Sequence, residues 1–232
     1  MKPVSLVSCI LLAAAVPALA QEWEFGLGAG YGFSRGADIR SDAGTARAGF
    51  GRGLVLSAYG AQNGDWLSGE LRYDFKFSDS HLSGLGQSTS LDGQVHSLHF
   101  DFLFHPRQRR VQPFVILGAG IRYYRATGTP LPIQPLGTIA ALMRANQVEP
   151  LIAPGVGLKL KVGGRAVVRL ELRDYITPFP QKVITPYSGT DASWKLKYPP
   201  PILTLEPTGR TGSDVSGWLH DFTPMVSIGV TF

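Results

Sequence analysis

The chain has 232 residues and a formal net charge of +5, and only 17% of its residues are charged, compared with about a quarter in typical soluble domains. Its 28 glycines and the lack of Lys- and Glu-rich helical segments favour an all-β protein. The small positive excess argues against nucleic-acid binding. The single cysteine, Cys9, lies in the leader described next, which excludes disulfides, thiolate catalysis and cysteine metal sites from the mature chain.

Residues 1–20 have the pattern of a secretory signal peptide. Lys2 precedes an apolar run from Val7 to Val16, and an A-x-A cleavage site ends at Ala20. This run is too short to cross a membrane as a helix, and no later stretch is apolar for about 18 residues. We therefore expect export, cleavage near Ala20, and a single mature domain over residues 21–232.

The first expected strand covers residues 23–33. Its two faces alternate strictly, with large apolar residues from Trp23 to Phe33 on one side and glycines on the other. Gly26-x-Gly28-x-Gly30 could be mistaken for a phosphate-binding loop, but no helix follows it. The pattern indicates a strand whose inner face leaves room for side chains opposite.

Seven further segments alternate in the same way, and most have the nine to eleven or so residues needed to cross a bilayer at a tilt. In chain order they are residues 46–59, 66–77, 95–105, 111–125, 148–162, 166–175 and 220–232. In the segment 46–59 the alternation is imperfect, because Arg52 falls on the same face as Phe50 and Leu54. The last segment carries apolar residues at every second position from Phe222 to Phe232.

The connections alternate in length. Residues 60–65, 106–110 and 163–165 are short enough for tight turns, whereas residues 34–45, 78–94, 126–147 and 176–217 form long loops. Short turns on one side and long loops on the other are typical of outer-membrane barrels, whose long loops are extracellular. An even number of strands places both ends of the barrel domain on the periplasmic side. The pattern therefore predicts an all-β fold, an eight-stranded antiparallel up-and-down transmembrane barrel.

A soluble ligand-binding barrel also has alternating strands, but its apolar face points inward. In this chain one face carries charges in nearly every strand, with glycines between them. The other face is almost uncharged and has aromatic residues near the strand ends, as a lipid-facing band with aromatic girdles would. The transmembrane arrangement is therefore favoured.

The chain resembles the small eight-stranded outer-membrane barrels of the outer-membrane protein A and W type. The resemblance covers residues 21–232 and rests on the glycine-alternating first strand, the segment Gln112 to Gly120, and the final segment Val226 to Phe232. These motifs concern architecture and imply no catalytic site. The resemblance implies that Phe232 acts as a signal for the barrel-assembly machinery.

The inward positions carry nearly balanced charges. An eight-stranded barrel has room only for its own side chains or one small ligand, so these charges must pair with one another. We predict a salt-bridged interior without a continuous aqueous pore, and a gated, narrow polar path is the alternative. The predicted interior charge network consists of Glu70, Arg72, Asp74, Lys76, Asp101, Arg122, Lys159, Arg169, Glu171 and Arg173.

Few residue combinations suggest catalysis. His220 and Asp221 at the outer end of the last strand, with Asp174 on the neighbouring strand, could activate water. His81-x-Ser83 in a loop is faintly similar to the His-x-Ser of outer-membrane lipid A deacylases, where that motif lies on a lipid-facing strand. The simpler interpretation is that His220 and Asp174 lie just above the membrane and hydrogen-bond to loop backbone, so we expect no enzyme activity.

The remaining candidates concern binding. His96, His99 and His105 do not share a face and spacing that suit a metal, and we expect no metal and no cofactor. Arg35, Arg40 and Arg47 flank the first long loop and could pair with lipopolysaccharide phosphates, although a solvated loop is equally consistent. A basic periplasmic turn contains Arg107, Arg109 and Arg110 and is most simply solvated.

The long loops are expected to be the recognition surface. Within the loop 126–147, residues 138–146 contain Ile139, Leu142 and Met143 at the spacing of one helical turn that would cap the barrel mouth. Residues 176–217 contain Pro199-Pro200-Pro201 together with Tyr187, Trp194 and Tyr198, which suggests adhesion or ligand capture, although a merely mobile loop is equally consistent.

Taken together, the sequence predicts a monomeric integral protein of the outer membrane with a structural or loop-mediated binding role. Its expected partners are outer-membrane lipid, lipopolysaccharide and, during biogenesis, the barrel-assembly machinery. A narrow porin-like channel for small or hydrophobic solutes is the alternative, and an outer-membrane lipid-modifying enzyme is the second alternative.

Overall fold

The computed structural model describes residues 22–41, 44–84, 86–107, 110–127, 133–136, 140–186, 194–197, 204–207, 214–216 and 218–232. Residues 1–21, and with them the expected signal peptide, lie outside this range. The described part of the chain contains no helix that is long and apolar enough to cross a membrane.

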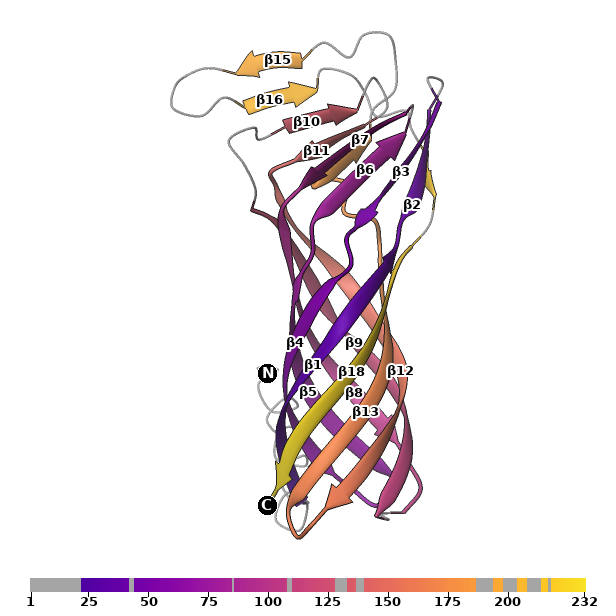
Figure 1. Ribbon diagram of the computed structural model, residues 1–232, viewed down its shortest axis with the longest axis vertical. Coiled ribbons are helices and arrows are strands. Elements are labelled where there is room, and N and C mark those ends of the chain that lie inside the picture. The colour runs from indigo at the N-terminus through magenta and orange to yellow at the C-terminus, as the bar shows by residue number, and fades with distance from the viewer. Residues whose placement is uncertain are drawn as a thin grey trace, which may run out of the picture.

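Eight strands form a closed antiparallel barrel, so the predicted fold is confirmed (Figure 1). They are β1 (Glu22–Arg35), β4 (Gly53–Asn63), β5 (Leu67–Phe77), β8 (Gly93–Phe104), β9 (Val111–Ala126), β12 (Asn146–Val162), β13 (Ala166–Thr177) and β18 (Leu219–Thr231). Each pairs with its neighbour in sequence, and β18 pairs with β1 through contacts such as Phe25 with Val230. At the lower end Trp23 and Phe232 exchange two backbone hydrogen bonds, which completes this seam.

The alternation of the strands divides the barrel into an apolar outside and a polar inside. In β18, for example, Phe222, Val226 and Ile228 are exposed on the outer surface, whereas Asp221 and Ser227 are buried in the interior. The outer surface carries aromatic residues near both ends of the strands. Near the long-loop end these include Phe33, Tyr73, Phe77 and Phe222, and near the turn end Trp23, Phe104 and Phe232.

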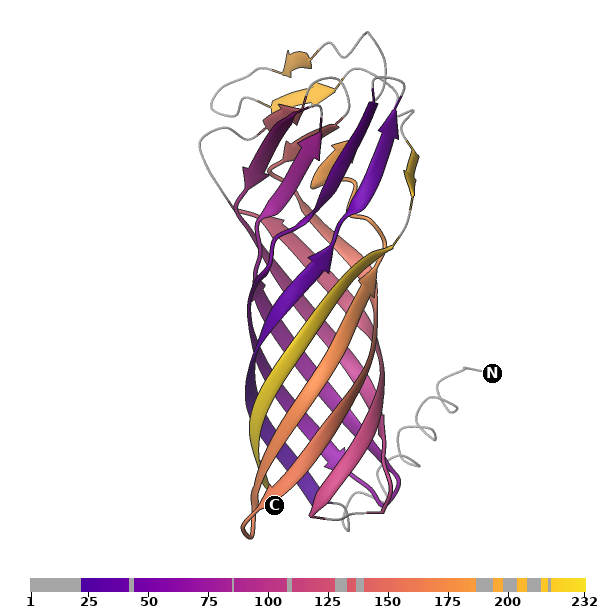
Figure 2. The same ribbon diagram turned by 45° about the vertical axis from the view of Figure 1, so that its right-hand side comes forward.

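The long loops contain short strands that continue the barrel upward, which the sequence did not predict (Figure 2). They include β2 (Ala37–Ser41), β3 (Gly44–Phe50), β6 (Ser80–Gly84), β7 (Gln87–Leu91), β10 (Ile133–Leu136), β11 (Ala140–Met143), β14 (Ile184–Pro186), β15 (Trp194–Lys197), β16 (Thr204–Pro207) and β17 (Asp214–Ser216). Five of them form one sheet in the order β17-β2-β3-β6-β7, and β10-β11-β14 form another.

The expected helical turn in residues 138–146 is wrong, because residues 140–143 form strand β11 and pair with both β10 and β14. Pairing with two neighbours satisfies the backbone hydrogen bonds that a helix would otherwise have to make internally. Leu142 is completely buried in the apolar cluster described next, so this loop does cover the barrel mouth. Ile139 lies outside the described residues, as do Tyr187, Tyr198 and the three consecutive prolines of the last loop.

The upper strands enclose an apolar cluster that continues the barrel interior (upper cluster). It combines inward side chains at the tops of barrel strands with side chains from the loop sheets. Its members are Ala37, Ile39, Ala46, Ala48, Leu82, Leu91, Val95, Tyr124, Ala126, Ala140, Leu142, Phe179, Val183, Ile184 and Leu219. Because Val95, Tyr124 and Leu219 belong to the barrel wall, this cluster fills the mouth.

The expected strand 46–59 is in fact two strands, β3 and β4, separated at Gly51 and Arg52. The alternation changes phase at this break. Phe50 therefore points inward and packs against Tyr124 with 4.7 Å between ring centroids, while Leu54 and Arg52 are exposed. Placing Arg52 on one face with Phe50 was wrong, because the two non-strand residues between β3 and β4 shift the period-two pattern.

Candidate functional site

The ten residues predicted for the interior all lie there, and none is more than 5% exposed. They come from five strands: Glu70, Arg72, Asp74 and Lys76 from β5, Asp101 from β8, Arg122 from β9, Lys159 from β12, and Arg169, Glu171 and Arg173 from β13. In the barrel order, β5 and β13 are four strands apart and therefore face each other across the bore. Contacts between these two strands cross the full width of the interior.

Four residues form a closed ring of alternating charge at the centre (central ring). Arg72 Nε lies 2.6 Å from Glu70 Oε1, and Arg72 Nη2 lies 3.1 Å from Glu171 Oε1. Arg173 Nε lies 2.8 Å from Glu171 Oε2, and Arg173 Nη2 lies 3.1 Å from Glu70 Oε1. Because each carboxylate is shared by both guanidinium groups, the ring joins opposite walls of the barrel and fills the bore.

Below the central ring, Arg169 connects two acidic residues. Its Nε donates to Glu24 Oε1 at 2.7 Å, and its Nη1 pairs with Glu70. Lys159 Nζ lies 3.0 Å from Glu24 Oε2. Tyr59 lies between the guanidinium groups of Arg169 and Arg72, at 4.2 and 4.8 Å from its ring centroid, and donates its hydroxyl hydrogen to Glu24. The aromatic ring thus stabilises two buried cations that lie close together.

Above the central ring, His99 lies between two carboxylates. Its Nδ1 is 2.6 Å from Asp101 Oδ1, and its Nε2 is 2.9 Å from Asp74 Oδ2. Both ring nitrogens can donate only in the imidazolium form. In that form this network is formally neutral, since five cations (Arg72, Lys159, Arg169, Arg173, His99) match five carboxylates (Glu24, Glu70, Asp74, Asp101, Glu171). This balance is what buried charges require.

A second, smaller charge group lies between this network and the upper cluster. Asp221 accepts from Lys76 Nζ at 2.8 Å and from Arg122 Nη2 at 2.5 Å. Ser34 also donates to Asp221 and accepts from Lys76. Arg122 lies over the ring of Tyr175, 5.2 Å from its centroid, and Tyr175 donates to Asp74 of the lower network.

The turn end of the barrel is closed by neutral polar contacts. Ser68 Oγ lies 2.8 Å from His105 Nε2, and Gln112 Nε2 lies 2.5 Å from His105 Nδ1. His105 follows the last residue of β8, and its partial burial lowers the pKa of the imidazole below its ordinary value. A neutral ring can accept at one nitrogen and donate at the other, which suits this position.

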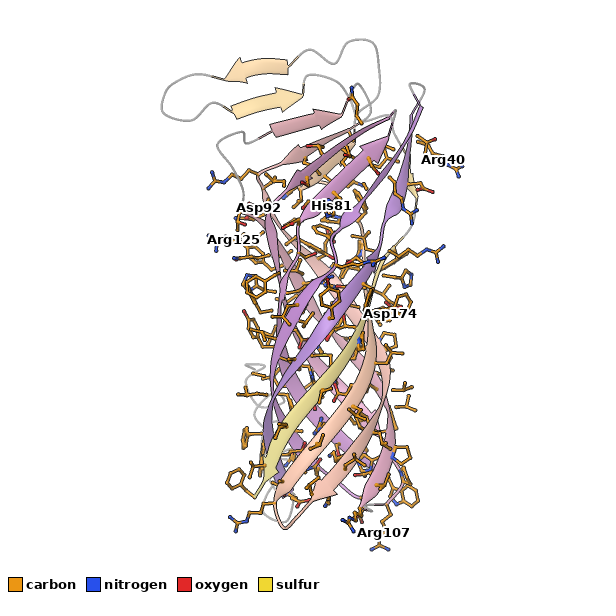
Figure 3. All side chains as sticks on the ribbon, viewed as in Figure 1. Arg40, His81, Asp92, Arg107, Arg125 and Asp174 are labelled. Carbon is orange, nitrogen blue, oxygen red and sulfur yellow. The ribbon has the colours of Figure 1, made fainter. Side chains whose placement is uncertain are left out.

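Apart from Asp221, the other candidates lie outside the interior. Asp174 Oδ2 is 2.8 Å from His220 Nδ1 on the outer surface, whereas Asp221 faces inward. His81 and Ser83 are exposed on β6 of the loop sheet (Figure 3). Among the described residues, His220 has Asp174 as a hydrogen-bonding partner and Phe222 as a stacked ring, but no hydroxyl or thiol nucleophile.

The basic residues are at the surface. Arg35, Arg40 and Arg47 are exposed at the loop end, and Arg107 and Arg110 are exposed at the turn end, while Arg109 lies outside the described residues. Within the described ranges no three His, Cys, Asp or Glu side chains are arranged to hold a metal ion.

Sequence reasoning missed several interior groups. It did not single out Tyr59 or Tyr175, although both are at inward positions, nor did it associate Lys76 and Arg122 with Asp221. Tyr59 was the last residue of the expected strand 46–59, and the arginines beside it come from β5 and β13, so no local pattern indicates its role. Tyr175 follows the inward Arg173 by two positions, and a search for aromatic residues beside inward arginines could have found it.

The fold and interior define a class: a small, closed barrel with an apolar outer band and a charged core. A scan against models of known families and a search of curated proteins both find no match. Among solved structures, the outer membrane protein OprG from Pseudomonas aeruginosa is similar, with 13% identity, 92% of this chain and 96% of that chain covered, and a TM-score of 0.50.

Two further structures match with lower TM-scores. Neisserial surface protein A has 10% identity, covers 91% of this chain and 97% of its own, and has a TM-score of 0.47. Ail from Yersinia pestis, in complex with the heparin analogue sucrose octasulfate, has 13% identity and a TM-score of 0.39, and the match covers 90% of this chain and 99% of Ail. At such identities the likeness concerns the fold alone, which is that of small eight-stranded outer-membrane barrels.

Proposed function

We propose that this protein is an integral outer-membrane barrel that is closed to solutes and acts structurally or by binding through its extracellular strands. The observation that carries the closed interior is the central ring, which joins β5 to β13 across the bore. The upper cluster fills the mouth above it. A side-chain-filled bore is what an eight-stranded barrel allows.

The membrane location is supported by the outer surface. Large apolar side chains such as Leu27, Val226 and Ile228 are at least half exposed. Exposing this apolar surface is unfavourable in water but not against the hydrocarbon of a membrane. The signal peptide expected at residues 1–20 agrees with export. Cell fractionation tests the location: we expect the protein in the outer-membrane fraction, with a gel mobility that shifts on boiling. Recovery from the soluble periplasm would contradict the proposal.

Solute flux distinguishes the closed barrel from a narrow channel. The purified protein is refolded into liposomes loaded with a small solute, and an open porin serves as the positive control. We expect flux at the level of protein-free liposomes, because the four residues of the central ring join opposite walls of the barrel and none is more than 5% exposed. Robust flux would favour the channel instead.

The extracellular strands supply the binding surface in this proposal. The sheet β17-β2-β3-β6-β7 holds exposed polar and basic residues, including Arg40, Arg47 and His81, on a packed apolar base. A catalytic role is not proposed, since the oriented imidazole of His220 has no nucleophile beside it among the described residues.

We also propose that Phe232 is recognised during assembly. Its backbone closes the β1–β18 seam with Trp23, and its ring packs edge-on against Phe25 at 6.3 Å between centroids. Phe232→Ala should lower the amount of heat-modifiable barrel in cells while leaving refolding of the purified chain nearly unchanged. If Phe232→Ala reduces the amount of barrel in cells and the refolding of the purified chain equally, Phe232 contributes to stability alone.

A further inference from the structure

An apolar groove crosses four adjacent strands on the outer surface: β1, β18, β13 and β12. Its volume is about 660 Å³, within the range of ligand-binding pockets. Outward side chains are short along its course at Ala29, Val156 and Pro224, while Tyr31 and Leu158 are longer and also line it. The groove therefore has the size and chemistry of an apolar binding site that opens outward from the barrel wall.

The groove follows two breaks in the strand pairing. The ladder between β18 and β1 stops at Met225 and resumes at Phe222, which leaves out Pro224 and Thr223. The ladder between β12 and β13 likewise leaves out Ala153 and Pro154. Proline has no N–H to donate to a neighbouring strand, so each break lies where a proline takes part. Both prolines line the hollowed surface.

A second hollow of about 290 Å³ extends the groove toward the loop end. It shares Val156 and Leu172 with the first hollow and reaches Asp174 and Phe222. Phe222 belongs to the aromatic residues near the upper ends of the strands. The combined groove therefore leads from the middle of the apolar band to the level at which polar lipid groups begin.

Polar side chains are held at this upper end. Asp174 accepts from the backbone N–H of Asp221 at 3.2 Å and faces His220 Nδ1 at 2.8 Å. The ring of His220 is stacked on Phe222 at 6.2 Å between centroids and 16° between planes. The imidazole is thus fixed on one side by a carboxylate and on its face by an aromatic ring. Since Nδ1 makes the contact with Asp174, and the described residues offer Nε2 no partner, Nε2 is left for a ligand.

One arginine is adjacent to this imidazole, and a second lies on the far side of β1, just before β4. Arg35 is the cross-strand neighbour of His220, and Arg52 lies over the ring of Phe33, 5.7 Å from its centroid. Both are exposed, and among the described residues neither pairs with a carboxylate. Arginine recognises phosphate oxygens through paired N–H groups.

We propose that this groove binds one acyl chain of an outer-leaflet lipid whose anionic phosphate group lies at Arg35 and His220. The proposal rests on the membrane location proposed above, since only there does the groove face hydrocarbon. The continuous apolar course, its position beside the aromatic girdle, and the exposed Arg35 beside His220 at its upper end together fit a lipid with one charged end. A soluble partner could contact the exposed arginines but could not occupy the apolar groove, because the groove faces hydrocarbon.

The test uses the full mature chain refolded into nanodiscs of phosphatidylglycerol and phosphatidylcholine in equal amounts, followed by native mass spectrometry of the released protein. We expect one retained lipid per barrel, with a preference for phosphatidylglycerol on the order of fivefold. Ala29→Trp fills the groove and should lower lipid retention on the order of tenfold. Arg35→Gln should abolish the headgroup preference while some lipid is still retained.

Matched controls lie on β9, which faces β1 across the barrel. Ala119→Trp makes the same change at an exposed outward alanine, and Arg125→Gln removes an exposed arginine near the loop end of the opposite wall. Both controls should retain lipid as the unchanged chain does. Gel mobility before and after boiling confirms that each variant has folded as a barrel.

Several outcomes would overturn the proposal. They are no retained lipid on a heat-modifiable barrel, equal losses in Ala29→Trp and Ala119→Trp, or a protein dimer that Ala29→Trp disrupts, which would assign the groove to a second copy. Failure of the chain to become heat-modifiable in any bilayer would instead contradict the proposed membrane function. The two failures are therefore distinguishable.

Discussion

Arg169 shows how single residues make a charged interior tolerable. Its guanidinium group contacts Glu24 and Glu70, and Tyr59 covers one of its faces. A buried ion pair adds little net stability, since both charges have lost their hydration. Removing one partner is strongly destabilising, because the other charge is then left buried and uncompensated.

Arg169→Ala should therefore destabilise the barrel by about 3–5 kcal/mol. Unfolding by urea or guanidinium in detergent or lipid, followed by the loss of heat-modifiable mobility, measures this change. Arg110→Ala, at an exposed turn position, is the matched control and should change stability by no more than about 0.5 kcal/mol. Similar midpoints for both variants would mean that the network contributes nothing to the fold.

The glycines of β1 are the counterpart of the large inward side chains. A Cβ at Gly26 would fall on the phenol ring of Tyr59, whereas a Cβ at Gly60 on the outer face would meet only the edge of Phe25 at 3.2 Å. Gly26→Ala should cost about 1–3 kcal/mol through overpacking, and Gly60→Ala clearly less. Equal unfolding midpoints would show that Tyr59 can move aside without loss.

At the scale of elements, the short loop strands depend on the apolar cluster that they enclose. Leu82 on β6 is completely buried in the upper cluster, and its neighbour Ser83 is exposed. Strands of about five residues are rarely stable without such packing. The extracellular part should therefore unfold more easily than the barrel itself.

Leu82→Asp places an unpaired charge in the upper cluster and should unfold the loop sheet while the barrel stays intact. Limited proteolysis should then cleave residues 78–94 at least about tenfold faster, with heat-modifiable mobility preserved. Ser83→Asp on the exposed face is the control and should not change the cleavage rate. Protection of this loop in the Leu82→Asp variant would show that the upper cluster does not hold the sheet.

At the scale of the whole molecule, the charged core is shielded from solvent on every side. The lipid-facing wall surrounds it, neutral polar contacts lie below it, and the upper cluster lies above it. Mobile ions screen exposed charges strongly but buried pairs much less.

Stability should therefore depend little on ionic strength. Raising the salt concentration to about 1 M, where the Debye length is only about 3 Å, should weaken exposed pairs such as Lys161 with Glu22 and leave the central ring unaffected. The unfolding midpoint of the unchanged chain is measured at low and at high salt. Its shift between these conditions should be smaller than the shift that Arg169→Ala causes at constant salt. A large loss of stability in salt would indicate that water reaches the interior.

The sequence by itself determined which residues face inward and which face outward, because period-two alternation is a property of each strand alone. It thereby indicated eight barrel strands and placed charges such as Glu70, Arg72, Glu171 and Arg173 in one interior. It failed at Arg52, where two non-strand residues shift the phase, and at residues 140–143, where pairing with two neighbours overrides a helical spacing.

Only the tertiary structure decided which inward charges meet. Arg72 on β5 reaches Glu171 on β13 because closure and tilt bring strands nearly a hundred residues apart to opposite walls at one height, and no local pattern encodes that height. The same holds for the upper cluster, built from six loop strands, and for the groove, which exists because Pro154 and Pro224 lie on either side of β13 on a single face.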